Sequence, residues 1–310
     1  MRSIVTGGAG FIGSHLVDHL VGAGVEVIII DSLISGDINS IKGHLDAGKV
    51  RLESADLLSD NWQHLFSGAD RVYHLAADPD VRESSIHPDK QLNNTIMATH
   101  RVLEAMRAAN VQEIVFTSTS TVYGEATEIP TPESYTPMEP VSVYGAAKLS
   151  CEALISAYCY SYGFKSWIFR FANIIGARSG HGVITDFIRK LRANPNELEI
   201  LGDGSQTKSY LEVRACIGAI MFAIMNASRQ VNTFNIGSED WISVTEIADI
   251  ISEEIGLTPK YRYTGGSRGW VGDVPRMQLD ITRMKELGWR PDITSRESVR
   301  VAVQAALELR

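Results

Sequence analysis

The sequence has little cysteine, no excess of positive charge and no long apolar run. Its three cysteines have no C-x-x-C spacing, which argues against a disulfide framework or a zinc site, so we expect packed thiols and no metal. Lysine and arginine number 29 against 37 acidic residues, and the net charge of −8 gives no general attraction for nucleic acid or anionic lipid. No apolar run approaches the ~18 to 20 residues that span a bilayer. We therefore expect a soluble, cytoplasmic protein without a nucleic-acid or membrane partner.

The pattern of apolar residues predicts an α/β protein. In the first half, short β-branched or aliphatic runs alternate with longer amphipathic stretches, which is typical of a parallel sheet with crossover helices. We expect strands at residues 3–6, 25–30, 50–54, 71–75, 113–117 and 166–171, and helices at 13–22, 60–66, 91–109 and 144–162. The predicted fold class is a Rossmann-type doubly wound parallel sheet with a smaller C-terminal substrate domain.

The expected domain division follows a change in composition after residue 173. Beyond it, loops rich in glycine, serine and asparagine surround short helices expected at 183–192, 213–226 and 245–255. We expect residues 1–173 to form a cofactor-binding domain with a return strand near 231–237. Residues 174–310 would then form a smaller, discontinuous substrate domain.

A glycine-rich turn joins the first expected strand to the first helix. Residues 6–13 read TGGAGFIG, and such glycines allow a tight turn and let a pyrophosphate approach the free N–H groups of a helix N-terminus. Asp31 follows Gly13 by 18 residues, close to the offset of about 20 at which an acidic side chain binds an adenosine ribose. Asp31 would repel a ribose 2′-phosphate, which favours NAD over NADP; the alternative is an ordinary turn with a capping aspartate. The predicted cofactor residues here are Gly7, Gly8, Gly10, Phe11, Ile12, Gly13 and Asp31.

A tyrosine and a lysine form a second candidate site. In SVYGAAK, Tyr144 and Lys148 are four residues apart and share one face of a helix, a spacing that also occurs by chance. A phenol titrates near ~10, but a lysine ammonium and a nicotinium cation would favour the phenolate and make Tyr144 a base. Residues 116–124, FTSTSTVYG, support this because they end an apolar strand in hydroxyl groups at the carboxyl edge of the sheet, where ligands bind.

These features together resemble the extended short-chain dehydrogenase/reductase family, in its NAD-dependent epimerase/dehydratase type, along essentially the whole chain. The resemblance extends to residues 55–57 (ADL), 74–77 (HLAA), 170–176 (RFANIIG), 202–210 (GDGSQTKSY), 272–273 (GD) and 287–291 (LGWRP). It implies NAD as the cofactor and a nucleotide sugar, a UDP-hexose, as the substrate. It also implies a homodimer in which the helices expected at 91–109 and 144–162 pack against a second copy.

The resemblance assigns roles in catalysis and cofactor binding. Thr119, Tyr144 and Lys148 would be catalytic; many relatives have serine in place of Thr119, and a threonine hydroxyl can make the same hydrogen bonds. Asp56 and Leu57 would hold the adenine. The residues lining the rest of the dinucleotide would be Ala76, Ala77, Tyr144 and Lys148.

The resemblance also implies contacts with the substrate. The pyrophosphate would lie near Asn173, Lys208 and Arg268, and the uracil would lie near Glu199, Ile200 and Leu201. Thr119 and Met277 would face the sugar. Met277 lies four residues after Asp273 and is unbranched and flexible, so UDP-glucose and UDP-galactose would be the main pair, with some tolerance of N-acetylated sugars.

Several positions depart from the family pattern. Thr95 stands where an asparagine usually contacts the cofactor, and Lys208 stands where arginine is usual, which keeps the charge but loses the bidentate fork. An arginine that grips a phosphate is replaced by Trp270, and Arg268 is the nearest alternative.

The residues after Thr119 distinguish between reactions of the family. The dehydratases have Asp-Glu there and the decarboxylases have a glutamate at the second position, whereas this chain has Ser120 and Thr121. The resemblance therefore implies NAD-dependent 4-epimerisation of a UDP-hexose through a transient 4-keto intermediate. The alternatives are a decarboxylase, a dehydratase or a net reductase of a nucleotide sugar, or an inactive NAD-binding protein.

Overall fold

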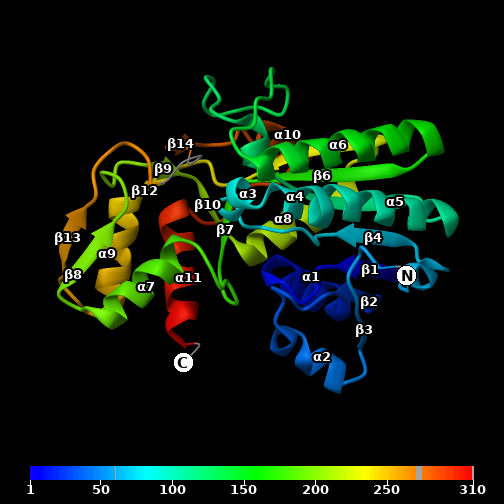
Figure 1. Ribbon diagram of the computed structural model, residues 1–310, viewed down its shortest axis with the longest axis horizontal. Helices are drawn as coiled ribbons and strands as arrows, with labels where there is room; N and C mark the ends of the chain where they lie inside the picture. Colours follow the sequence, from blue (N-terminus) through cyan, green and yellow to red (C-terminus); the bar gives the residue numbers. More distant parts are fainter. Residues whose placement is uncertain (60, 270–273, 309–310) are drawn as a thin grey trace. The chain divides into compact units, whose positions relative to one another are not determined.

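The structure is a computed structural model that describes residues 1–59, 61–269 and 274–308 (Figure 1). The chain divides into two compact units, which are considered separately. The first comprises Met1–Gly124, Met138–Arg170 and Ile220–Phe234, and the second comprises Glu125–Pro137, Phe171–Ala219 and Asn235–Arg310.

A seven-stranded sheet forms the centre of the first unit. Its strands lie in the order β11-β6-β5-β4-β1-β2-β3, and the pairs β1–β2, β1–β4, β2–β3 and β4–β5 are parallel. The strand order reverses between β1 and β4, and ligands of doubly wound sheets bind at the carboxyl ends of the strands at such a reversal. The predicted Rossmann-type fold class is therefore confirmed. The strands are β1 (Arg2–Thr6), β2 (Glu26–Asp31), β3 (Val50–Ser54), β4 (Arg71–His74), β5 (Glu113–Thr119), β6 (Lys165–Phe171) and β11 (Val231–Ile236).

Helices cover both faces of this sheet. Val72 and Phe116 on the strands pack with Met106 of α5 (Ala98–Ala108) and Ile155 of α6 (Val143–Tyr162) in one buried cluster. Helix α1 (Phe11–Gly22) packs on β1 and β2. Apolar residues on both sides of the strands are fully buried, which explains why the strands read as continuous apolar runs.

Two of the helices predicted for the first unit have a different form in the structure. The helix expected at 60–66 is a 3₁₀ turn, η2 (Gln63–Phe66). The helix expected at 91–109 consists of α4 (Pro88–Gln91), a π-helical turn η3 (Leu92–Met97) and α5. Apolar periodicity does not distinguish such turns from an α-helix. The other short helical elements of this unit are η1 (Ile38–Ser40), α2 (Lys42–Asp46), α3 (Glu83–Ile86) and η4 (Ser120–Tyr123).

The second unit has small paired strands and its own apolar core. Strand β7 (Asn173–Ile175) pairs with β10 (Tyr210–Glu212), β8 (Glu197–Ile200) pairs with β13 (Lys260–Tyr263), and β9 (Thr207–Lys208) lies between β12 (Ile242–Ser243) and β14 (Arg276–Met277). Its core includes Leu191, Ile247 and Val299, one from each of the long helices. The helices are α7 (Val183–Ala193), α9 (Val244–Ile255), α10 (Thr282–Leu287) and α11 (Ser295–Glu308), and α8 (Val213–Asn226) runs from this unit into the first.

The three cysteines are free and buried. Burial raises the pKa of Cys151, Cys159 and Cys216, so the thiols stay protonated at neutral pH. In the part of the chain that the structure describes, no helix is both long and apolar enough to cross a membrane.

A buried ion pair joins α6 to β6 in the first unit. The Arg170 guanidinium donates to Glu152 Oε2 at 2.6 Å, and both side chains are less than a tenth exposed. Arg170 also donates to the Tyr123 hydroxyl at 2.9 Å, and Ser118 donates to Glu152. Burial alone would lower the pKa of Arg170, but the hydrogen bonds and charge of Glu152 raise it overall. Each charge therefore depends on its partner.

Removing one partner of this pair should destabilise the protein strongly. Arg170→Met leaves the Glu152 carboxylate buried without its counter-ion, which should lower the free energy of unfolding by about 3 to 5 kcal/mol in urea titrations. The matched control is Arg107→Met, which removes the partner of Glu104 from a solvent-exposed ion pair, and that loss should be much smaller. Equal losses in the two variants would show that burial does not make Glu152 depend on Arg170.

Candidate active site

One face of α6 is docked against the end of β5. Three consecutive residues at the strand end each contact one of three α6 residues that lie four apart, and so share a helix face. The contacts join the Lys148 amine to the Thr117 carbonyl oxygen at 2.9 Å, the Ser118 hydroxyl to the Glu152 carboxylate, and the Tyr144 hydroxyl to the Thr119 side chain. The three residues predicted to be catalytic, Thr119, Tyr144 and Lys148, thus lie together.

Burial dominates the electrostatics of Tyr144. It raises the pKa of the phenol to about 12, although a hydrogen bond with Thr119 lowers it; the negative charges that Asp78 and Cys151 can carry add to the rise. The lowered pKa expected from the sequence refers to the site with a nicotinium cation bound, and the value of about 12 refers to the chain alone. The phenol of the chain alone is protonated at neutral pH, and a further positive charge is needed to make it a base.

Lys148 supplies a buried positive charge one helical turn after Tyr144. Burial lowers the pKa of its ammonium to about 8, and the charges of Cys151 and Glu152 oppose that shift. The ammonium is therefore mostly charged at pH 7. It lies 4.8 Å from the centre of the Phe116 ring, in addition to donating to the end of β5.

The hydroxyl of Thr119 is oriented by its neighbour Thr121. Thr119 Oγ1 accepts hydrogen bonds from the Thr121 backbone N–H and from the Thr121 hydroxyl, both at 3.1 Å. These bonds use both lone pairs of Thr119 Oγ1, so its own proton remains available for the Tyr144 oxygen. Thr119 can therefore donate to the Tyr144 oxygen and stabilise a phenolate there.

The turn between β1 and α1 requires glycine, because the chain packs closely on itself there. A Cβ atom at Gly7, which has φ +70°, would lie 2.7 Å from the Ala76 nitrogen, and one at Gly13 would lie 2.1 Å from the Gly7 oxygen. Gly10 is the N-cap of α1 and has no side chain to occupy the N–H groups of the first turn. Such a bare helix N-terminus fits the pyrophosphate of a dinucleotide.

Asp31 ties the end of β2 to this turn. Its two carboxylate oxygens accept hydrogen bonds from the backbone N–H groups of Ala9 and Leu33, each at 2.9 Å. The local capping role, which is the alternative interpretation of Asp31, is therefore present. Each oxygen keeps a further lone pair, so the carboxylate can also accept from a ribose hydroxyl.

The other predicted cofactor residues lie along the same sheet edge or in the core. The Ala76 N–H donates to Thr6 Oγ1 at 3.3 Å, at the end of β1, and Ala77 follows it half-buried. Asp56 is exposed and accepts from the Leu58 N–H at 2.9 Å. Leu57 is buried within the apolar core, so its backbone is the part that a ligand can reach most readily.

Three predicted substrate residues gather around Ser209 in the second unit. The Asn173 side chain donates to the Ser209 carbonyl oxygen at 3.1 Å, and the Ser209 N–H donates to the Met277 carbonyl oxygen at 3.1 Å. Lys208 precedes Ser209 and lies opposite Met277 in the parallel pair β9–β14. The structure therefore places Asn173, Lys208 and Met277 close together.

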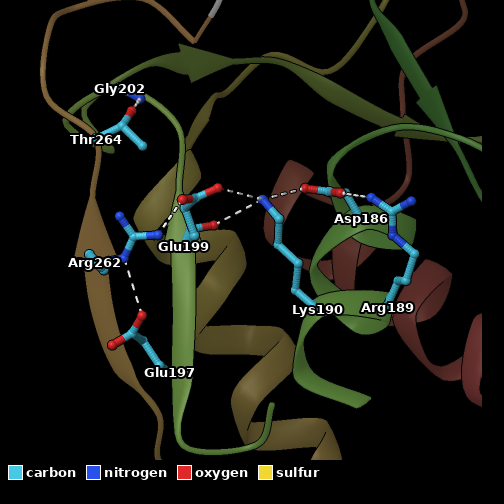
Figure 2. A network of polar contacts seen from close by, with 8 residues as sticks. All are labelled: Asp186, Arg189, Lys190, Glu197, Glu199, Gly202, Arg262 and Thr264. Atoms are coloured by element: carbon cyan, nitrogen blue, oxygen red, sulfur yellow. Dashed lines mark hydrogen bonds and ion pairs between the residues drawn. The ribbon is translucent and has the colours of Figure 1, made fainter. Parts of the chain in front are cut away.

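The residues predicted to contact the uracil, at the end of strand β8, make most of their contacts within the protein. The Glu199 carboxylate pairs with Arg262, and the Glu199 carbonyl oxygen accepts from Lys190 Nζ at 3.1 Å, as Figure 2 shows. Ile200 is fully buried in the core of the second unit, so its side chain packs inward. The carbonyl oxygen of Leu201 accepts from the Gln206 side chain at 3.2 Å. The charges of Glu199 are thus largely used within the protein.

Arg268 is held by a carboxylate that no sequence motif indicates. Its guanidinium donates to both oxygens of Glu125, at 2.6 and 2.9 Å, in a half-exposed ion pair within the second unit. A phosphate would compete with this carboxylate. The two residues are 143 positions apart, and no local pattern links them. Trp270, Gly272 and Asp273 lie outside the described residues.

Two buried polar residues near the candidate site were not predicted from the sequence. Glu152 lies four residues after Lys148 on the same helix face, a spacing that could have indicated it. His74, in the HLAA segment, contacts Thr6 and Thr99 at 2.7 and 2.9 Å. Burial lowers the pKa of His74 to about 3, so the ring is neutral.

Comparisons with known proteins agree with this geometry. The sequence profile of the NAD-dependent epimerase/dehydratase family matches residues 3–237. A crystal structure of a UDP-galactose 4-epimerase superposes with a TM-score of 0.90 and 42% identity, with each chain covered completely. The UDP-glucose 4-epimerase of Thermus thermophilus, solved with NAD, gives 0.88 and 30%, again with full coverage of both chains. UDP-glucuronic acid decarboxylase 1 of Arabidopsis thaliana is 29% identical over 96% of this chain and 68% of its own.

The profile match covers most of the chain, and the likeness to solved structures covers all of it. The resemblance drawn from the glycine turn and the Tyr144 and Lys148 pair is confirmed, and so is NAD as the cofactor. The relatives are UDP-sugar enzymes that include both epimerases and decarboxylases. This chain belongs to the NAD-dependent epimerase/dehydratase family.

Proposed function

We propose that the protein interconverts UDP-glucose and UDP-galactose by epimerisation at carbon 4, with NAD kept bound through turnover. The observation that carries this proposal is the docking of α6 on the end of β5, which gathers Thr119, Tyr144 and Lys148. Thr121 is the second supporting feature. It uses its N–H and hydroxyl to orient Thr119, at a position where a decarboxylase would have a glutamate.

The chain's own part in the reaction is to move and hold one proton. When bound, NAD supplies a hydride acceptor that carries a positive charge. The Tyr144 oxygen would take the proton of the sugar 4-hydroxyl and later return it. Thr119 would donate to the Tyr144 oxygen while it is negative, and the Lys148 ammonium would favour that negative form. No carboxylate is needed for these steps.

We propose that the cofactor lies on the glycine turn. Support comes from the N-terminus of α1, where Gly10 makes no side-chain cap, and from the spare acceptor capacity of Asp31. The full proposed set is Gly7, Gly8, Gly10, Phe11, Ile12, Gly13, Asp31, Asp56, Leu57, Ala76, Ala77, Tyr144 and Lys148.

We propose that the UDP moiety of the substrate uses the second unit. The cluster of Asn173, Lys208 and Met277 around Ser209 supports a shared site, with the first two at the pyrophosphate and Met277 at the sugar. Arg268 would leave Glu125 to join them. Strand β8 would offer backbone groups of residues 199–201 to the uracil, because Ile200 is buried.

We also propose a homodimer formed through α5 and α6 and the turn before them. Its support is a set of exposed large apolar side chains there: Leu92, Met97, Tyr160 and Tyr162. Symmetric dimers are the commonest assembly, and such side chains are the kind that an interface buries. Light scattering at micromolar concentration should give twice the chain mass of 34.0 kDa.

The proposed reaction can be tested with purified protein and no added cofactor. Incubation with UDP-glucose should yield UDP-galactose without accumulation of NADH, and denatured protein should release about one equivalent of NAD plus NADH. Tyr144→Phe should lower turnover by about 10² to 10⁴-fold. Tyr160→Phe is the matched control, because it removes a hydroxyl from the same helix and keeps the ring that the proposed dimer would bury.

Other products would favour other family reactions. Release of carbon dioxide from UDP-glucuronic acid, without interconversion of the hexoses, would favour decarboxylation, the second candidate given the Arabidopsis thaliana relative. NADH formed in proportion to product would indicate a net dehydrogenase. Either result would reject epimerisation.

Replacing Asp31 should change the choice of cofactor. Asp31→Ser removes the carboxylate that would accept ribose hydroxyls and repel a 2′-phosphate, so the purified variant should retain less NAD and should bind NADP more nearly equally. Affinities for both dinucleotides can be compared by fluorescence titration. Asp37→Ser is the matched control, since Asp37 also caps a turn, by accepting from the Asn39 N–H at 2.9 Å. If both variants keep the original preference, Asp31 is only a cap.

A further inference from the structure

Residues 76–78, which follow β4, are held at each end by a part-buried hydrogen bond. At the start, the Ala76 N–H donates to Thr6 Oγ1 at 3.3 Å. Two residues on, the Asp78 carbonyl oxygen accepts from Gln91 Nε2 at 3.1 Å. These residues are the ones proposed to line the dinucleotide, so whatever fixes them also fixes a wall of the cofactor site.

The hydrogen bond at Ala76 is connected, through Thr6 and His74, to the π-helical turn η3. Thr99 Oγ1 donates to the Thr95 carbonyl oxygen at 2.7 Å, so it must accept from His74 Nε2 at 2.9 Å. The neutral His74 ring carries one N–H, and its Nδ1 therefore accepts from Thr6 Oγ1 at 2.7 Å. With its proton used in that way, Thr6 is left to accept from Ala76. The donor and the acceptor of each of these four hydrogen bonds are therefore determined.

The hydrogen bond at Asp78 is connected to the same residue, Thr95. The Thr95 hydroxyl donates to Gln91 Oε1 at 3.0 Å, and the Gln91 amide then donates to Asp78. Thr95 thus serves the two ends of the segment with two different atoms, its carbonyl oxygen and its hydroxyl. The five side chains of this circuit, Thr6, His74, Gln91, Thr95 and Thr99, are at most 1% exposed, so water cannot easily replace a lost partner.

The place of Thr95 in the helix is also unusual. It lies in η3 (Leu92–Met97), a π-helical turn, and such turns are rare and often found at functional sites. Members of the family usually have an asparagine at this position, and its side chain contacts the cofactor; this chain has Thr95 instead. A threonine is shorter, and here its polar atoms are both used within the protein.

We propose that Thr95 and Gln91 are positioning residues for NAD, which hold residues 76–78 against the cofactor through this closed circuit in place of a direct contact. This rests on the proposed role of Ala76 and Ala77 in lining the dinucleotide. Removing the Thr95 hydroxyl leaves the buried amide oxygen of Gln91 without its donor, and this loosens the side chain that holds Asp78. The bound cofactor then dissociates faster, while the reacting groups on α6 stay in place.

The experiment uses the purified NAD-bound protein and two readouts. Thr95→Val removes the hydroxyl and keeps the shape, and the rate of NAD loss on dilution should rise about 10-fold, the effect of one buried unsatisfied group. Hydrogen exchange of the peptide spanning residues 75–79, measured with NAD in excess, should also become faster. Gln91→Met cuts only the branch to Asp78 and should change both readouts in the same direction, which provides a second test if Thr95→Val folds poorly.

Thr95→Ser is the matched control, because it keeps the hydroxyl and should restore both readouts to those of the parent protein. Faster NAD loss without faster exchange would overturn the proposal and indicate a direct contact between Thr95 and the dinucleotide. Faster exchange with unchanged NAD loss would overturn it by showing that the segment does not hold NAD. A parent protein that yields no dinucleotide when it is denatured would instead reject the proposed function itself, so the two failures are distinguishable.

Discussion

The docking of one face of α6 on the end of β5 is the contact on which the candidate chemistry depends. Residues 117, 118 and 119 each contact one residue of a helical row spaced by four. Residues spaced by four lie along one line of a helix, whereas successive strand residues point in alternate directions. The three contacts can therefore form together only when α6 lies at one position along β5. A shift of α6 by one turn would break all three contacts together. The Glu152 and Arg170 pair also holds α6 to strand β6.

This docking has an electrostatic consequence. Burial raises the pKa of Tyr144 to about 12 and lowers that of Lys148 to about 8, and both shifts oppose the charged forms. The chain alone therefore holds a neutral phenol beside a cation with a reduced affinity for its proton. A ligand that brings positive charge to the phenol is needed to shift its proton at neutral pH. A site of this kind is suited to a cofactor that stays bound.

The first half of the fold could be predicted from sequence because its signals are local. Buried parallel strands read as apolar runs, and the turn after β1 needs glycine where a Cβ would collide with Ala76 or Gly7. The position of Tyr144 relative to Lys148 also follows from helix geometry alone. Local rules failed at η3, where a π-helical turn has the same apolar spacing as an α-helix.

Features that join distant residues could not be predicted. The Arg268 pair with Glu125 depends on tertiary contact across 143 positions, and the inward packing of Ile200 depends on the core of the second unit. The depth at which Tyr144 is buried also depends on tertiary packing, and it raises the pKa of the phenol in the chain alone. Spacing shows which charges are near, but burial sets how strongly the neutral form is favoured.

In the proposed reaction, one bound cofactor takes hydrogen from carbon 4, and the same hydrogen returns to the opposite face. UDP-glucose labelled with deuterium at carbon 4 tests this most directly, with the protein in catalytic amount and unlabelled NADH in the solution. We expect UDP-galactose to retain the deuterium at carbon 4 through many turnovers. Loss of deuterium to water, or its replacement by hydrogen from the added NADH, would contradict the proposed reaction.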